Sequence, residues 1–135
     1  MGIEYDGTAY NGWQKQNVGT GIQSVVEDAV SEVADKKIDV ICAGRTDSGV
    51  HAVGQVVHYD TTADRTEYEW QSGVNSLLLD DINVKWTKII NQDFHARFSA
   101  VNRTYRYIIL NRKVRSSLLR KRCWWVHQDI DDSLM

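Results

Sequence analysis

Apolar and polar residues follow one another along the chain with two different periods, and each period predicts one kind of element. Over residues 20–34 the apolar positions recur three and four apart, which predicts a helix with one buried face. Residues 38–42 and 82–86 alternate between apolar and polar, which predicts strands. Residues 2–6 and 54–59 are also predicted as short strands.

Two helix starts carry the same cap signal, a threonine followed three residues later by glutamine or glutamate. Thr20 with Gln23 and Thr66 with Glu69 both have the spacing of a capping box. A second helix is therefore predicted to begin at Thr66. Its apolar positions are predicted to be buried, namely Trp70, Val74, Leu77 and Leu78.

The resulting order is strand, helix, strand, strand, helix, strand, which is the split βαβ or ferredoxin-like order. We therefore expect an α+β fold with an antiparallel sheet. An alternating run over residues 103–111 is expected to add a strand to that sheet. Residues 129–133 resemble the acidic first turn of another helix, so a longer protein with a second domain is expected. The expected domains are a ferredoxin-like half over residues 1–112 and a basic connector with the next helix start over residues 113–135.

The composition agrees with one globular domain. The chain has 135 residues, with 42% hydrophobic and 25% charged positions, values near the average of globular proteins. Cys42 and Cys123 have neither metal-type nor disulfide-type spacing, so reduced thiols and a cytoplasmic location are expected. No run approaches the roughly 18 apolar residues of a membrane span, so no membrane association is expected.

Basic residues gather in one segment, although the formal net charge of the chain is −2. Residues 103–122 contain half of the 16 lysines and arginines and no acidic residue. A segment of one sign is typical of a surface that binds a polyanion such as RNA. The alternative is a solvated face, although such a face usually carries both signs.

Residues 43–51 form the chemically richest stretch, a glycine-containing loop after a predicted strand. It carries a carboxylate, a guanidinium, two hydroxyls and an imidazole. We predict that Asp47 is the working residue, because a nearby cation such as Arg45 stabilises an ionised nucleophile. The alternative is a local turn in which Asp47 caps its own loop.

A second loop, residues 6–16, carries Tyr10 and Trp13 among glycines and amides. We expect both aromatic residues to pack and pin this loop. The alternative is that the loop lies along an RNA strand.

Other chemistries have weaker support in the sequence. A metal site could use Asp47, His51, His58 and His95, but their spacing fits no zinc signature. The chain also lacks a phosphate-binding loop, a dinucleotide fingerprint and a nucleophile elbow. Two alternatives to a nucleophilic enzyme stay open. One is a non-catalytic RNA-binding module, and the other is a metal-dependent hydrolase that chelators would inhibit.

Residues 43–51, Ala-Gly-Arg-Thr-Asp-Ser-Gly-Val-His, resemble the signature of the bacterial tRNA pseudouridine synthase A family. Further stretches resemble that family in the same order along the chain, namely residues 4–16, 54–58, 93–100 and 103–107. The resemblance covers nearly the whole chain and implies the first half of a two-domain pseudouridine synthase fold. The chain departs from the family at Lys15 and Leu79, where arginine and proline are usual.

The resemblance implies an enzyme that isomerises uridine to pseudouridine on the 3′ side of the tRNA anticodon stem-loop. It also implies a homodimer that uses no cofactor and no metal. Asp47 would be the nucleophile, attacking either the base or the sugar. Tyr105 would stack on the target base and is a candidate for proton transfer, and Arg45 would assist base flipping.

The same resemblance implies a set of RNA contacts, namely Arg65, Phe94, His95, Ala96, Arg97, Phe98 and Lys113. For Phe94, His95 and Phe98, packing beneath a loop is the alternative. In the family a second half supplies the opposite wall of the cleft. Residues 1–135 alone are therefore expected to be inactive.

Overall fold

The computed structural model describes residues 1–134 and divides the chain into two compact units, Met1–Asn102 and a second unit from Arg103 onward. Each unit is described by itself. The domain boundary predicted between residues 112 and 113 lies within the second unit and stays a prediction. In the described part of the chain, no helix is long and apolar enough to cross a membrane.

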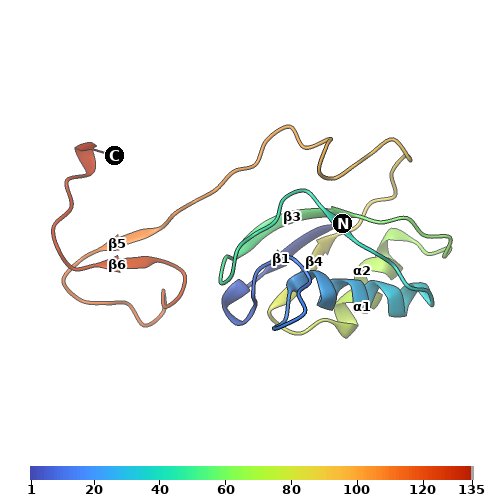
Figure 1. Ribbon diagram of the computed structural model, residues 1–135, viewed down its shortest axis with the longest axis horizontal. Coiled ribbons are helices and arrows are strands. Elements are labelled where there is room, and N and C mark those ends of the chain that lie inside the picture. Colours follow the sequence, from blue (N-terminus) through green and yellow to red (C-terminus); the bar gives the residue numbers. More distant parts are fainter. Residues whose placement is uncertain (135) are drawn as a thin grey trace. The chain divides into compact units, whose positions relative to one another are not determined.

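The first unit is an antiparallel sheet with two helices on one side (Figure 1). Its elements are β1 (Gly2–Tyr5), α1 (Ile22–Ala34), β2 (Ile41–Cys42), β3 (Ala52–His58), α2 (Glu67–Leu77) and β4 (Ile82–Trp86), with a 3-10 turn at Gly7–Ala9. The strands lie in the order β2-β3-β1-β4, and all neighbours are antiparallel. The predicted α+β class and element order are confirmed.

β1 lies in the interior of the sheet, and its buried residues meet both neighbouring strands. Ile3 pairs with Gln55 on β3 and with Val84 on β4. The fully buried side chains around it are Ile22, Val26 and Val30 of α1, Val57 of β3, Val74 of α2 and Val84 of β4. Full burial of one such apolar side chain stabilises the folded state by roughly 1.5–3 kcal/mol. The helices pack closely at Gly73, where a Cβ atom would lie 3.1 Å from Val33.

The apolar stripe of α2 is confirmed at its centre and wrong at its end. Trp70 and Val74 are buried, as predicted, whereas Leu77 is 47% exposed. The helix ends at Leu77, and Leu78 adopts extended backbone angles. Because the chain leaves the helix there, Leu78 packs against the core and Leu77 does not.

The start of α1 differs from the predicted capping box. The helix begins at Ile22, its N-cap is Gly21, and no side chain caps it. The free N–H groups of the first turn instead donate to the preceding loop, from Ile22 to the Gly12 carbonyl at 3.1 Å and from Gln23 to the Trp13 carbonyl at 2.8 Å. Main-chain carbonyls of the preceding loop therefore take the place of the predicted Thr20 cap.

The start of α2 confirms the other capping box. The Thr66 hydroxyl accepts a hydrogen bond from the Glu69 N–H at 3.2 Å, and the Glu69 carboxylate accepts one from the Thr66 N–H at 2.7 Å. These hydrogen bonds from Thr66 hold the pKa of Glu69 below its ordinary value. Among residues 1–134, no other segment caps this helix end in their place.

Replacing Thr66 with alanine should lower the free energy of unfolding by about 1 kcal/mol, the usual contribution of an N-cap side chain. The matched control is Thr20→Ala, because Thr20 has the same sequence signal but does not cap its helix. Urea unfolding of both variants gives the comparison. Equal losses at the two sites would contradict the assignment of the caps.

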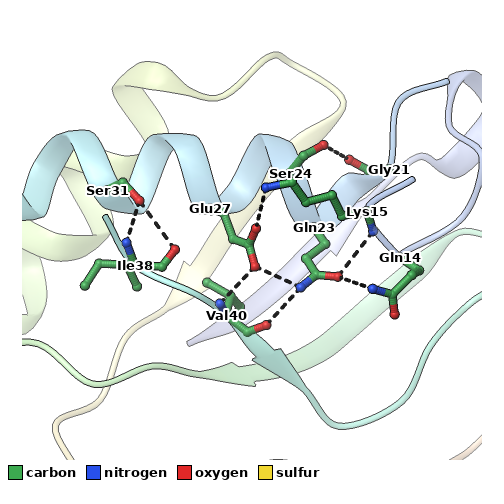
Figure 2. Close-up of polar contacts among 9 residues, drawn as sticks. All are labelled: Gln14, Lys15, Gly21, Gln23, Ser24, Glu27, Ser31, Ile38 and Val40. Atoms are coloured by element: carbon green, nitrogen blue, oxygen red, sulfur yellow. Dashed lines mark hydrogen bonds and ion pairs between the residues drawn. The ribbon is translucent and has the colours of Figure 1, made fainter. Parts of the chain in front are cut away.

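The predicted strand over residues 38–42 is shorter in the structure, where only Ile41–Cys42 belongs to β2. Side chains of α1 take the hydrogen bonds that a neighbouring strand would otherwise make (Figure 2). The Ile38 N–H donates to Ser31 Oγ at 2.9 Å, and the Val40 N–H donates to Glu27 Oε1 at 3.1 Å. The alternating pattern predicted an extended backbone, but the helix supplies its partners.

Glu27 is a buried carboxylate, with 5% of its surface exposed. Besides Val40 it accepts a hydrogen bond from Gln23 Nε2 at 2.8 Å, and Lys15 Nζ lies 3.5 Å away (Figure 2). A buried carboxylate is tolerated when its oxygens are paired in this way. Glu27 therefore joins α1, the 6–16 loop and the approach to β2.

The second unit corrects the prediction that residues 103–111 extend the sheet. Only Ile109–Asn111 forms a strand, β5, and it pairs in parallel with β6 (Trp124–Val126) in a separate two-stranded sheet. Alternation defines two faces of an extended segment, but it does not specify the partner strand. At the predicted helix start, the structure has a 3-10 turn at Asp132–Leu134.

Candidate active site

Asp47 lies in the loop that joins β2 to β3. The two strands continue to bond beyond β2, because the Ala43 N–H donates to the Val56 carbonyl at 2.8 Å. Gln55 is buried in β3, and its side-chain amide donates to the Gly44 carbonyl at the base of the loop. Asp47 itself is exposed. The hairpin therefore presents this carboxylate on an exposed loop whose two flanking strands are joined by hydrogen bonds.

The 6–16 loop holds the residues on both sides of Asp47. The Trp13 N–H donates to the Thr46 carbonyl at 2.9 Å. The Ser48 hydroxyl and the Gly49 N–H both donate to the Tyr10 carbonyl, at 3.2 and 3.3 Å. The backbone of the Asp47 loop is thus anchored by residues more than thirty positions earlier in the chain.

Buried aromatic rings support the Thr46 side of this loop. Tyr5 is 2% and Trp13 1% exposed, and their ring centroids lie 6.1 Å apart. The Tyr5 hydroxyl and Thr46 Oγ1 are 2.8 Å apart, and burial raises the pKa of Tyr5, so its phenol stays protonated at neutral pH. The prediction that Tyr10 and Trp13 are packing residues is confirmed, since both are buried.

Gly12 lets the two loops approach closely. Its φ is +89°, and a Cβ atom there would lie 2.5 Å from the Thr46 carbonyl oxygen. Only glycine combines this backbone conformation with the necessary space. The residue therefore determines how near the 6–16 loop lies to Asp47.

Across residues 1–134 the Asp47 carboxylate has neither a hydrogen bond nor an ion pair. The alternative of a self-capping turn is therefore wrong, because the hydrogen bond from the Val50 N–H, at 3.2 Å, goes to the Asp47 main-chain carbonyl. The predicted pairing of Arg45 with this carboxylate is also not formed in this structure. Both side chains are exposed, where hydration competes with an ion pair.

His51 closes the other end of the loop. Its Nδ1 lies 3.1 Å from the Gly7 nitrogen and 3.0 Å from Asp6 Oδ1. These contacts tie the start of β3 to the end of β1. Among residues 1–134, no three His, Cys, Asp or Glu side chains are grouped so that they could hold a metal ion.

Five of the predicted RNA contacts come together in one turn, residues 94–98, beside the end of β3. The Ala96 N–H donates to His58 Nδ1 at 3.1 Å, and Ala96 is 2% exposed. The His95 ring stacks on Phe98 with centroids 4.3 Å apart, and the Arg97 guanidinium lies 5.9 Å from the Phe98 centroid. Phe98 is 78% exposed, so the packing alternative does not apply to it.

Two arginines act electrostatically on the same thiol at the end of β2. Burial raises the pKa of Cys42, and the charges of Arg45 and Arg97 oppose that shift. Arg45 belongs to the Asp47 loop and Arg97 to the turn at residues 94–98. Both cations are therefore near enough to the end of β2 for their charges to act there.

The other predicted site residues belong to other segments of the chain. Arg65 lies just before α2, and its Nε and Nη2 atoms both donate to the Val33 carbonyl at 3.3 Å, near the end of α1. Tyr105 and Lys113 belong to the second unit, where Tyr105 is exposed and Lys113 Nζ lies 3.3 Å from Asp129. Their roles stay predictions.

No sequence pattern indicates several of the contacts that support the loop. Tyr5 bonds Thr46 across 41 positions, and the Tyr10 hydroxyl donates to Asp81 Oδ1 at 2.7 Å across 71 positions. No local pattern relates such distant polar pairs. Gly12 was the nearest available clue, as a glycine between Tyr10 and Trp13.

Comparisons with known proteins bear on the same residues. A family model described as tRNA pseudouridine synthase matches residues 1–99, which include Asp47 and the turn at residues 94–98. The chain is 52% identical over 135 residues to tRNA pseudouridine synthase A of Shewanella denitrificans, covering 100% of this chain and 52% of the relative. The corresponding protein of Pseudoalteromonas atlantica is 48% identical, with 100% and 51% covered. The chain thus spans about half the length of the curated relatives it matches.

Proposed function

Since the chain belongs to the tRNA pseudouridine synthase family, we propose that the protein converts uridine to pseudouridine in tRNA and that Asp47 is the nucleophile. One observation carries the assignment of the nucleophile. Asp47 is an exposed carboxylate without a hydrogen bond or ion pair in the described chain, on a loop whose flanking residues are anchored. A positioned and uncommitted carboxylate is suited to nucleophilic attack.

In the proposed reaction an Asp47 oxygen attacks the target nucleoside, at either the base or the sugar, and forms a covalent bond. The bond between uracil N1 and ribose C1′ breaks, and the uracil turns while it is held. A new bond then joins C5 to C1′, the C5 proton leaves to a base, N1 gains a proton, and the bond to Asp47 breaks. Substrate and product are isomers, so no electrons are gained or lost.

The proposed substrate is a uridine on the 3′ side of the anticodon stem-loop, which must leave its stack at a cost of a few kcal/mol. Arg45, exposed in the Asp47 loop, would help to extract it, and Tyr105 would stack on the extracted base. Arg97 and the exposed Phe98 offer a cation and an aromatic face for the RNA strand. The proposed RNA contacts also include Arg65, Phe94, His95, Ala96 and Lys113. The protein is proposed to act as a cytoplasmic homodimer.

A non-catalytic RNA-binding module is the second candidate, because the exposed Phe98 and the basic residues 103–122 would serve binding alone. It differs from the enzyme in one requirement. For binding, Asp47 would be dispensable.

Release of tritium from 5-tritiated uridine in tRNA tests the proposed function, because isomerisation detaches the C5 hydrogen. We expect release by the product of the complete reading frame, unaffected by a chelator, and none above background by residues 1–135 alone. The relatives are about twice as long, and the family's second half would form the opposite wall of the cleft. A chelator-sensitive reaction, or no release by the longer product, would overturn the proposal. Turnover by residues 1–135 would overturn only the claim about the isolated chain.

A further inference from the structure

We propose that His58 is a positioning residue, which holds the turn at residues 94–98 through an uncharged imidazole and releases it when the imidazole is protonated. His58 ends β3 and pairs with Ile41 of β2. Its side chain is partly buried, and it lies between the sheet and the turn that carries Arg97 and Phe98. Neither the Asp47 loop nor its anchors include this histidine.

The hydrogen bond between the turn and His58 has a fixed direction. The Ala96 N–H donates and His58 Nδ1 accepts, at 3.1 Å. A nitrogen that accepts carries no proton, so the imidazole must be neutral with its proton on Nε2. A second proton would place an N–H of His58 opposite the N–H of Ala96. The bond that joins the turn to β3 would then be lost.

A second imidazole, inside the turn, also accepts hydrogen bonds through its Nδ1 atom. His95 Nδ1 accepts hydrogen bonds from the N–H groups of Arg97 and Phe98, at 3.2 and 3.3 Å. The rings of His58 and His95 have centroids 4.7 Å apart. The contact brings two acceptor imidazoles together, and charge on one of them opposes charge on the other. The turn is therefore built for the uncharged state of this pair.

The charged groups around His58 favour that state on balance. Burial lowers the pKa of His58, and the charges of His95, from the turn, and of the Met1 ammonium, just before β1, lower it further. Asp60, two residues beyond β3, acts in the opposite direction and is outweighed. The facing residue on β2 is Ile41, which has no charge. Stabilisation from neutral His58 is thus present above the unfolded pKa of about 6.5 and is lost as the pH falls through the lower folded value.

The consequence for RNA rests on the proposed function. Ala96 is the buried residue of the turn, and its neighbours Arg97 and Phe98 are the exposed ones. Release of the Ala96 N–H would leave Arg97 and Phe98 attached to the sheet less firmly. Affinity for tRNA would weaken, while the chemistry at the separately anchored Asp47 loop would continue in the complexes that form.

Amide exchange at Ala96 tests the positioning role without any reaction. The protein is expressed from its complete reading frame with 15N-alanine, and Ala96→Gly assigns the signal. We expect His58→Phe to raise the Ala96 exchange rate about tenfold at neutral pH, the usual effect of losing one hydrogen bond. His58→Asn supplies an acceptor oxygen near the position of Nδ1 but does not titrate, so it should restore protection and keep it at low pH. The wild type should lose protection as the pH falls below the ordinary histidine pKa of about 6.5, and so should the control His127→Asn.

Two exchange results would overturn the proposal. One is wild-type protection that does not change between pH 5 and 8. The other is His58→Asn losing protection in the same range as the wild type, which would assign the switch to His95. As a second measurement, tritium-release kinetics of His58→Phe should show a KM raised several-fold with kcat retained. If the protein forms no pseudouridine at all, the exchange results still decide the role of His58.

Discussion

Replacing Asp47 with asparagine should lower the rate of pseudouridine formation by at least about 10³-fold, because an amide oxygen is a poor nucleophile. The folded protein should be unaffected, since no residue of the described chain bonds this carboxylate. Affinity for tRNA should also be retained, because the proposed contacts lie elsewhere. Tritium release and a tRNA-binding titration of the same preparation separate the two properties.

The matched control for this variant is Asp28→Asn. Asp28 is also an exposed aspartate of the first unit, but it lies on α1 and carries no proposed role. It should retain the wild-type rate. If Asp47→Asn retained that rate as well, the nucleophile would be misassigned. If neither the wild type nor the variant released tritium while both bound tRNA, the RNA-binding module would be the better account.

Replacing Gly12 with alanine should reduce activity by about 10²-fold, because it displaces the Asp47 loop by a distance on the scale that matters for catalysis. The new Cβ would lie 2.5 Å from the Thr46 carbonyl oxygen, which also accepts the Trp13 N–H hydrogen bond. Backbone atoms would have to move, and the positive φ adds a strain of roughly 1 kcal/mol. Tritium release and urea unfolding measure the two effects.

Two other glycines separate the collision from the strain. Gly49 has a φ of +78° but nothing within 4 Å of an added Cβ, so Gly49→Ala should show the strain without the collision. Gly54 has neither a positive φ nor a close neighbour, so Gly54→Ala should retain both stability and activity. An activity loss at Gly49 equal to that at Gly12 would show that strain alone accounts for the effect.

The two threonine signals show how far a local pattern reaches. Thr66 caps α2 as its sequence predicts, because the capping box is completed within four residues. Thr20 has the same spacing to Gln23, but the carbonyls of Gly12 and Trp13 take the free N–H groups of α1. The loop that precedes the helix therefore takes the place of the local cap, and the residues around Thr20 do not indicate this.

The strand predictions have the same limit. Residues 82–86 were predicted as a strand, and β4 spans Ile82–Trp86. Residues 38–40 alternate just as well, yet their N–H groups bond to Glu27 and Ser31 of α1. Residues 103–111 yield only the three-residue β5, paired with β6. Alternation determines an extended backbone with two faces, whereas the hydrogen-bonding partner depends on which segment lies alongside.

For this protein the sequence by itself determined which reactive side chains are present and in what order the helices and strands follow one another. The composition of residues 43–51 pointed to Asp47. The patterns of apolar residues, together with the cap signal at Thr66, predicted two helices and four strands that the structure contains. Only the tertiary structure decided that Asp47 has no hydrogen bond or ion pair among residues 1–134, that Arg45 does not bond it, and that Tyr10 and Trp13 anchor its loop. The physical reason is distance along the chain. Element type follows from neighbouring residues, whereas the surroundings of a carboxylate are set by groups that only folding brings near.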